Sequence, residues 1–174
     1  DLLVEGRPEA MGTPASRNAA VSALFTRAAA VANDAVAQHT RAGAENPAAC
    51  TFVAALVHDG VVHVANVGDS RAYWLPDGAE GRILTRDDSL AEASIANGVP
   101  RKEAEDAADA HTLTRWLGID AQDVVPHTAA AHVTGPGWVL VCSDGLWNYA
   151  STPAALAMAL AQAVDAARPL PAGG

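Results

Sequence analysis

Residues 61–75 contain the feature that most constrains the fold, a strand, a polar corner and a second strand in direct succession. Val61 to Val67 is rich in β-branched residues and almost uncharged, which predicts a strand covered on both faces. Gly68 then allows the backbone to turn, and Asp69 stands where the strand ends. A carboxylate directed off the edge of a sheet offers oxygen donors to a hard cation, or forms part of a phosphate-handling site.

The segments on either side of this run predict an antiparallel arrangement. Asp59-Gly60 is the dipeptide of a two-residue hairpin turn, so 51–58 pairs with 61–68 and sets Ala54 opposite Ala65. Because Thr51 to His58 is apolar on both faces, we expect an inner strand there. Residues 72–75 and 83–85 are expected to continue as further strands of an antiparallel meander, with a turn at 76–78 between them.

Three helices and two further strands complete the expected elements. Thr13-Pro14 is typical of a helix start, and the apolar spacing behind it predicts a helix of about 25–28 residues that ends near Gly43. A short helix is expected from Leu90 to Asn97, and another from Pro153, whose buried face is marked by Leu156, Leu160 and Val164. The strands are expected at 124–133 and 138–142. Grouped strands with few, long helices predict an α+β layered sandwich rather than a doubly wound sheet.

The composition narrows the class of protein. A length of 174 residues is expected to make one domain, 1–174, and the net charge of −9 argues against a nucleic-acid binder, whose surface would be basic. No apolar run approaches the roughly 18 residues of a membrane span. Cys50 and Cys142 lie in apolar runs and are expected to be buried free thiols, which favours the cytoplasm. Since the chain starts at Asp1 without methionine, we expect a piece of a longer protein.

The arrangement at Asp69 occurs a second time, at Asp144. This residue also follows an apolar strand and also lies beside a glycine. Two such carboxylates suit Mg²⁺ or Mn²⁺, which take oxygen ligands and keep several waters. The alternative is that each aspartate only shapes its own turn, since Asp next to Gly is common in tight turns. Spacing alone leaves both interpretations open.

Four segments of the chain resemble the metal-dependent protein phosphatases of the PPM (protein phosphatase 2C) type. They are Val67-Gly68-Asp69-Ser70-Arg71-Ala72-Tyr73, Leu84-Thr85-Arg86-Asp87-Asp88-Ser89, Leu113-Thr114-Arg115-Trp116-Leu117-Gly118 and Val141-Cys142-Ser143-Asp144-Gly145-Leu146-Trp147-Asn148. The resemblance implies a four-layer αββα sandwich of two antiparallel sheets flanked by helices, here in truncated form. It also implies the hydrolysis of phosphoserine and phosphothreonine in phosphoproteins by water activated by Mn²⁺ or Mg²⁺.

Two metal ligands follow from this resemblance. Asp144 matches the aspartate that binds the second ion of the family's binuclear pair, and Asp69 matches the aspartate of a third, weaker ion. Residues 90–112 match the flap beside the active site, where Arg101 and Lys102 either touch substrate or form a solvated surface.

The other charged residues of these segments are given structural roles. Arg71 and Arg115 are expected to be internal hydrogen-bond or salt-bridge partners, and Asp87 and Ser89 to cap the helix that follows. Asp88 stands where the family has histidine. No side chain qualifies as a general acid, and His111, beside the flap, is the weak candidate.

Departures from the family leave two hypotheses. The family's first arginine strand and Asp-Gly-Met-Gly-Gly segment have no match in residues 1–14, and its last Asp-Asn-x-Thr segment has none before Gly174. The chain is therefore expected either to be part of a phosphatase, incomplete at both ends, or to be a non-catalytic module that binds or regulates. With one core carboxylate of the binuclear pair present, little or no turnover is predicted for these 174 residues alone. The substrate protein and the oligomeric state have no signal in the sequence.

Overall fold

The computed structural model describes residues 13–41, 44–150 and 152–167. Its helices are α2 (Pro14–His39), α3 (Leu90–Ala96), α4 (Arg101–Glu105), α5 (Asp144–Trp147) and α6 (Pro153–Ala166). Its strands are β1 (Ala49–Cys50), β2 (Phe52–His58), β3 (Val61–Val67), β4 (Arg71–Pro76), β5 (Arg82–Ile83), β6 (Leu117–Gly118), β7 (His127–His132) and β8 (Gly137–Cys142). Every paired strand is antiparallel to its neighbour.

Helix α2 begins where the sequence predicts. The Thr13 side chain accepts a hydrogen bond from the Ser16 backbone N–H, the Ser16 side chain accepts one from the Thr13 N–H, and Pro14 occupies the first turn. The helix ends at His39, with Thr40 as its C-terminal cap. The predicted stop at Gly43 lies outside the described residues.

The hairpin of β2 and β3 has the predicted turn and register. Asp59 and Gly60 both have positive φ angles, of 49° and 70°, as a two-residue turn of this kind requires. Ala54 lies opposite Ala65, as predicted. β2 is also covered on both faces, as expected of an inner strand in a layered fold: Phe52, Ala54 and Leu56 pack on the α2 side, and Val53 and Ala55 pack between the sheets. β3 is the central strand, between β2 and β7, and within the described residues β2 pairs only with β3.

The expectation that 72–75 continues the antiparallel meander of the hairpin was wrong, because β3 and β4 lie in different sheets. One sheet has the order β2-β3-β7 and the other β5-β4-β8. The chain crosses between them at residues 68–70, which we call the corner. Gly68 has a φ of 94° there, and a Cβ on it would lie 2.5 Å from the Thr51 side-chain methyl. A glycine is therefore needed both for the turn and for the close approach of β2.

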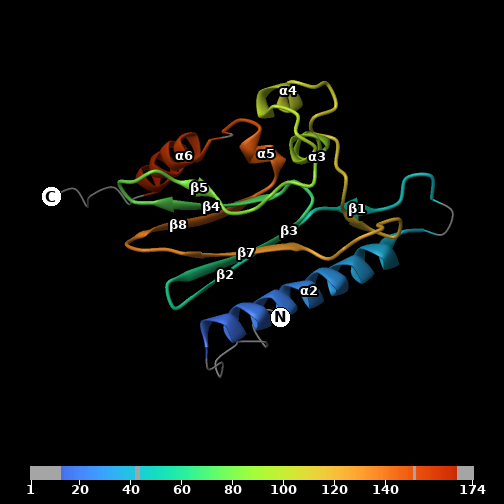
Figure 1. Cartoon of the computed structure of the whole chain (residues 1–174), viewed down its shortest axis with the longest axis horizontal. Helices are drawn as coiled ribbons and strands as arrows, with labels where there is room; N and C mark the ends of the chain where they lie inside the picture. Colours follow the sequence, from blue (N-terminus) through green and yellow to red (C-terminus); the bar gives the residue numbers. More distant parts are fainter. Residues whose placement is uncertain (1–12, 42–43, 151, 168–174) are drawn as a thin grey trace.

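The two sheets are stacked between helices, as Figure 1 shows, with α2 below one sheet and α6 above the other. On the α2 side, Val21 and Phe25 pack against Ala54 and Ala65. On the α6 side, Leu156 packs against Tyr73, Leu75 and Trp147. Between the sheets, Val62 and Val64 of β3 meet Ala72 of β4. The predicted αββα sandwich is thus confirmed.

The segment 90–112 forms a small unit above one end of the sandwich, with α3 and α4 side by side in Figure 1. Its own apolar cluster consists of Ala91, Ala104 and Ala110, with Ile95 and Val99 packed against them. The helix predicted from Leu90 is present and begins after the cap Ser89. The charged stretch is α4, whose side chains lie largely in solvent.

The two cysteines differ from the prediction in their burial. Both thiols are free, but Cys50 is exposed on the two-residue strand β1, and Cys142 is only partly buried. An apolar run did not bury Cys50 because β1 pairs only with the equally short β6 in the described structure. Among the described helices, none has the length and apolar character that a membrane crossing requires.

Candidate functional site

Asp69 and Asp144 lie at the same end of one pair of strands. The ladder of β4 and β8 ends at the pair Arg71 and Cys142. Asp69 precedes that pair by two residues and Asp144 follows it by two, so an antiparallel ladder brings both aspartates to one edge. Asp69 is half-buried in the corner, whereas Asp144 is exposed at the first position of α5.

The electrostatics of the pair favour a bound cation. Burial raises the pKa of the Asp69 carboxyl, and the nearby Asp144 and Asp87 carboxylates raise it further. The ionised form of Asp69 is therefore disfavoured until a positive charge neutralises the pair. Oxygen donors alone are what Mg²⁺ and Mn²⁺ accept, and one or two carboxylates with water suffice for Mg²⁺. Over the described ranges, no group of three or more His, Cys, Asp or Glu side chains is arranged to hold a metal. Asp69 and Asp144 fit a hydrated ion, not an ion enclosed by protein.

The third nearby carboxylate, Asp87, is engaged by Arg71. The guanidinium Nη2 donates to Asp87 Oδ2 at 2.6 Å, and Nε donates to both carboxylate oxygens at 3.1 Å. Burial alone would lower the pKa of Arg71, but the hydrogen bonds and charge of Asp87 together with the neighbouring Tyr73 outweigh it and leave the pKa raised. The predicted internal role of Arg71 is confirmed. The predicted capping role of Asp87 was wrong. The N-terminal cap of α3 is Ser89, whose side chain accepts a hydrogen bond from the Glu92 backbone N–H.

Trp147 connects the two aspartate-bearing segments. Its indole Nε1 donates to the backbone oxygen of Asp69 at 3.0 Å, and its ring lies 3.8 Å from the Arg71 guanidinium carbon. Trp147 is buried and belongs to the same four-residue helix as Asp144. One side chain therefore fixes the position of the corner relative to α5. The sequence motif contains Trp147 but gave no indication of this contact.

A cleft of about 730 Å³ lies under the segment 90–112; Asp69 and Asp144 are not among its lining residues, but Arg71, two residues after Asp69, is. Arg71, Asp87 and Trp147 line its floor, and Arg101 and His111 line the side formed by the segment. His111 is exposed, and its ring centroid is 5.8 Å from that of Trp147. The cleft thus combines cationic and acidic side chains with one aromatic floor.

The two cations proposed for the flap already have partners. Arg101 Nη1 lies 3.1 Å from Glu92 and 2.8 Å from Glu105, and Lys102 Nζ lies 2.6 Å from Asp106. Arg101 faces the cleft, whereas Lys102 is 88% exposed and does not line it. Arg101 is therefore better placed than Lys102 to contact a molecule in the cleft.

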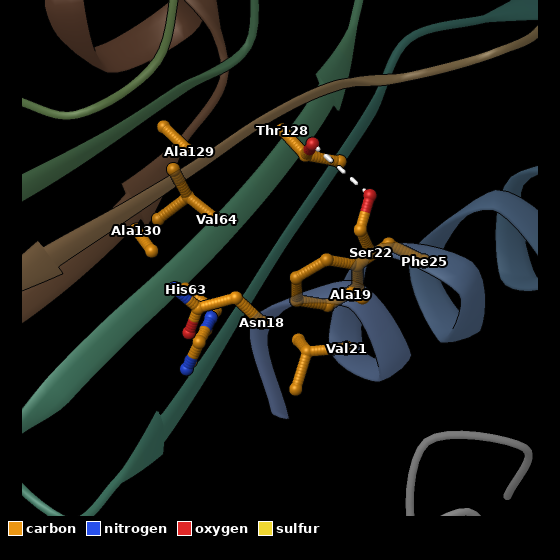
Figure 2. Close-up of a pocket in the computed structure, with 10 residues that line it drawn as sticks. All are labelled: Asn18, Ala19, Val21, Ser22, Phe25, His63, Val64, Thr128, Ala129 and Ala130. Atoms are coloured by element: carbon orange, nitrogen blue, oxygen red, sulfur yellow. Dashed lines mark hydrogen bonds between the residues drawn. The ribbon is translucent and has the colours of Figure 1, made fainter. Parts of the chain in front are cut away.

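A second cavity, of about 310 Å³, lies between α2 and the β2-β3-β7 sheet and is drawn in Figure 2. Val21 and Phe25 form its apolar wall, and Ser22 and Thr128 share a hydrogen bond of 3.2 Å. His63 is buried there; burial lowers its pKa, and His58 lowers it further. No carboxylate lines this cavity, so it lacks the donors of a cation site.

Sequence reasoning missed a buried network behind the corner. Asp88, Arg115 and His127 come together there, and Asn66 donates to the Gly68 oxygen. The internal role predicted for Arg115 is confirmed. His127 and Asp88 are 39 residues apart in the sequence, and only the pairing of β7 with β3 brings them into contact.

The sequence resembles known bacterial phosphatases. Over 99 residues it is 35% identical to the serine/threonine phosphatase stp of Listeria innocua, a match that covers 56% of this chain and 38% of the Listeria protein. No family model matches the chain. The chain therefore spans well under half the length of the curated relatives that it matches.

The fold resembles solved phosphatase structures. The S. agalactiae serine/threonine phosphatase superposes with a TM-score of 0.70 at 22% identity, over 91% of this chain and 65% of that one. The catalytic domain of the phosphatase PstP, in complex with two manganese ions, gives a TM-score of 0.52 at 23% identity, over 92% and 69% of the two chains. These comparisons confirm the resemblance to the PPM-type phosphatases, and the fold is theirs.

Proposed function

We propose that this chain is part of a metal-dependent serine/threonine phosphoprotein phosphatase. The observation that carries the proposal is the convergence of Asp69 and Asp144 at one end of β4 and β8, where each lies two residues beyond the last pair of the ladder. Burial, and then the Asp144 carboxylate, raise the pKa of Asp69, and a cation bound by both carboxylates would offset these two effects. The manganese ions in the structure of PstP support the same ion here.

The residues of this chain would hold and orient the reacting groups. Asp69 and Asp144 would supply ligands to Mn²⁺ or Mg²⁺, which when bound polarises a phosphoryl group and acidifies a coordinated water. Arg71 holds the nearby Asp87 carboxylate in place through hydrogen bonds from Nε and Nη2. Trp147 holds the corner against α5 through the Asp69 backbone oxygen. These contacts fix the donors before substrate arrives, which is how a protein contributes to such a site.

We assign the cleft under the segment 90–112 to the phosphoprotein substrate. The segment 90–112 would act as a flap, and Arg101 would contact acidic or phosphorylated groups of the substrate. Residues 1–174 would form one phosphatase domain, incomplete in this chain. The two free thiols favour a cytoplasmic location, because oxidising compartments convert such thiols to disulfides.

The second candidate is a non-catalytic module that binds without turnover. One observation favours it: over the described residues, only two carboxylates converge, and no third completes a metal-binding group. A module of this kind would still bind Mn²⁺ and phosphopeptide, but it would release no phosphate. The two candidates therefore differ in product, not in binding.

The test measures phosphate release from a phosphothreonine peptide and from p-nitrophenyl phosphate with Mn²⁺. Both these 174 residues and the complete product of the gene are assayed. We expect Mn²⁺-dependent turnover by the complete product, reduced at least about 100-fold in Asp144→Ala, and little or none by the 174 residues alone. The matched control is Asp77→Ala, which removes an exposed carboxylate at the opposite end of the β4–β8 ladder and should leave activity unchanged. A complete product that binds Mn²⁺ and peptide without releasing phosphate would favour the non-catalytic module.

A further inference from the structure

We propose that Asp88 is a positioning residue that holds the corner, and with it Asp69, in the geometry of the metal site. The part of this inference that concerns metal rests on the proposed function. The part that concerns the corner rests on hydrogen bonds alone. Asp88 is the residue at which the chain differs from the family segment it resembles, which has histidine there.

Asp88 is joined to Gly68 by two hydrogen bonds of opposite direction. The Gly68 N–H donates to Asp88 Oδ2 at 2.9 Å, and the Asp88 N–H donates to the Gly68 oxygen at 3.0 Å. The amide of Asn66 donates to the same Gly68 oxygen at 3.1 Å. Both polar backbone atoms of Gly68 are therefore bound, so its φ and ψ are held although glycine itself would allow many values.

The Asp88 carboxylate is in turn held from two other elements. His127 Nε2, at the start of β7, donates to Oδ1 at 2.8 Å, and Arg115 Nη1 donates to Oδ1 at 3.3 Å. The Asp88 side chain is 4% exposed, and the Arg115 side chain 17%. A carboxylate this buried is stable only when donors and opposite charge surround it, and here Gly68, His127 and Arg115 provide both.

This arrangement matters for the metal site because Asp69 directly follows Gly68. Asp69 and Asp144 each lie two residues beyond the last pair of the β4–β8 ladder, so both carboxylates stand at one edge. A rotation of the corner would separate the two carboxylates, and like charges repel each other. The hydrogen bonds from Asp88 oppose that rotation, because they would have to break in a buried place for the corner to turn. Asp88 thus keeps the pair assembled for the ion.

The experiment compares Asp88→Asn with two controls. Asparagine keeps the size of the side chain but has one acceptor oxygen, so it cannot serve Gly68, His127 and Arg115 together. Asp123→Asn removes another carboxylate partner of Arg115, at 3.0 Å, without a contact to Gly68. Val21→Ala lowers stability through the core under α2, away from the corner. Two quantities are measured: hydrogen exchange of the Gly68 amide, and Mn²⁺ affinity from water-proton relaxation.

We expect Asp88→Asn to accelerate Gly68 amide exchange at least about 10-fold and to weaken Mn²⁺ binding about 10- to 100-fold, the usual effect of losing a support behind a metal ligand. Both controls should leave both quantities within about twofold of the unchanged protein. If Asp88→Asn only lowers the melting temperature, as Val21→Ala does, the inference is overturned. If the unchanged protein binds no Mn²⁺, the proposed function fails, and Gly68 exchange still decides whether Asp88 holds the corner.

A reciprocal exchange provides a second variant. Asp88→His alone puts a second imidazole beside His127 and Arg115, and should accelerate Gly68 exchange as Asp88→Asn does. Asp88→His combined with His127→Asp restores one acid and one histidine to the same two places, and should recover at least half of the lost protection. A purely space-filling role for residue 88 predicts no such recovery, and its absence would contradict the pairing.

Discussion

His63 shows how position decides the chemistry of a single side chain. It lies on the face of β3 that α2 covers and is 5% exposed. It faces a cavity bounded by Phe25 and Thr128 (Figure 2). Burial lowers its pKa first, and His58 lowers it further. The pKa of Asp69 shifts in the opposite direction, because burial and neighbouring acids raise it. Burial disfavours the charged form of both groups. It therefore lowers the pKa of a histidine, whose charged form is protonated, and raises the pKa of a carboxyl, whose charged form is deprotonated.

The lowered pKa of His63 predicts acid sensitivity. The folded-state pKa lies below the unfolded value of about 6.5, so neutral His63 contributes stability above that pH, and the contribution is lost as pH falls toward the folded pKa. Between pH 8 and 5.5, the melting temperature of the unchanged protein should fall further than that of His63→Gln. His39→Gln, an exposed histidine on α2, is the control. Equal pH dependence in His63→Gln and the unchanged protein would contradict this.

At the scale of elements, the corner decides the architecture. Residues 68–70 take the chain from the central strand of one sheet, β3, into the central strand of the other, β4. The same turn delivers Asp69 to the edge where α5 begins. Trp147 and Asp88 then hold the corner from two sides. One short turn thus sets both the sandwich and the candidate site.

Gly68→Ala should therefore be costly. Its Cβ would lie 2.5 Å from the Thr51 methyl carbon, and its φ of 94° is unfavourable for alanine. We expect a loss of about 2–5 kcal/mol in the free energy of unfolding, measured in urea. Gly78→Ala is the matched control, since its φ is also positive, at 70°, but no atom lies within 4 Å of the added Cβ. Its loss should be about 1–2 kcal/mol.

The difference between the two glycines can be assigned with Thr51→Ser. Serine lacks the methyl that the new Cβ would meet, and it keeps the hydroxyl that contacts Ser70 at 2.8 Å. Gly68→Ala should cost about 1–3 kcal/mol less in the Thr51→Ser background, the usual range for overpacking. An equal cost in both backgrounds would show that the methyl contact is not the reason for the glycine, since the residue-51 Cβ, 2.9 Å from the added Cβ, remains in both.

At the scale of the whole molecule, much of the architecture could be predicted from local chemistry. Asp59-Gly60 determined the hairpin register, and Thr13-Pro14 located the start of α2, because each depends on a few neighbouring residues. The sheet that β4 enters could not be derived from residues alone, since packing decides where a chain goes after a glycine turn. The same holds for the exposure of Cys50.

The candidate site divides in the same way. Asp69 and Asp144 could be singled out because each stands next to glycine at the end of an apolar strand, and their meeting follows from the pairing of β4 with β8. The contact of Asp88 with His127 had no sequence signal, since it depends on β7 lying beside β3. Local sequence patterns singled out the two proposed metal ligands. Only the assembled sheets showed the contacts that surround them.

The central proposal is that Asp69 and Asp144 share one divalent cation, whereas the family resemblance alone assigns them to separate second and third ions. Crystals soaked in Mn²⁺ and measured at the manganese edge would test it directly through anomalous density. We predict a peak within about 2.0–2.6 Å of a carboxylate oxygen of each residue, and no peak there in Asp144→Ala. A peak bound by only one of the two, or a well-ordered pair of side chains with no peak between them at high Mn²⁺ concentration, would contradict the account.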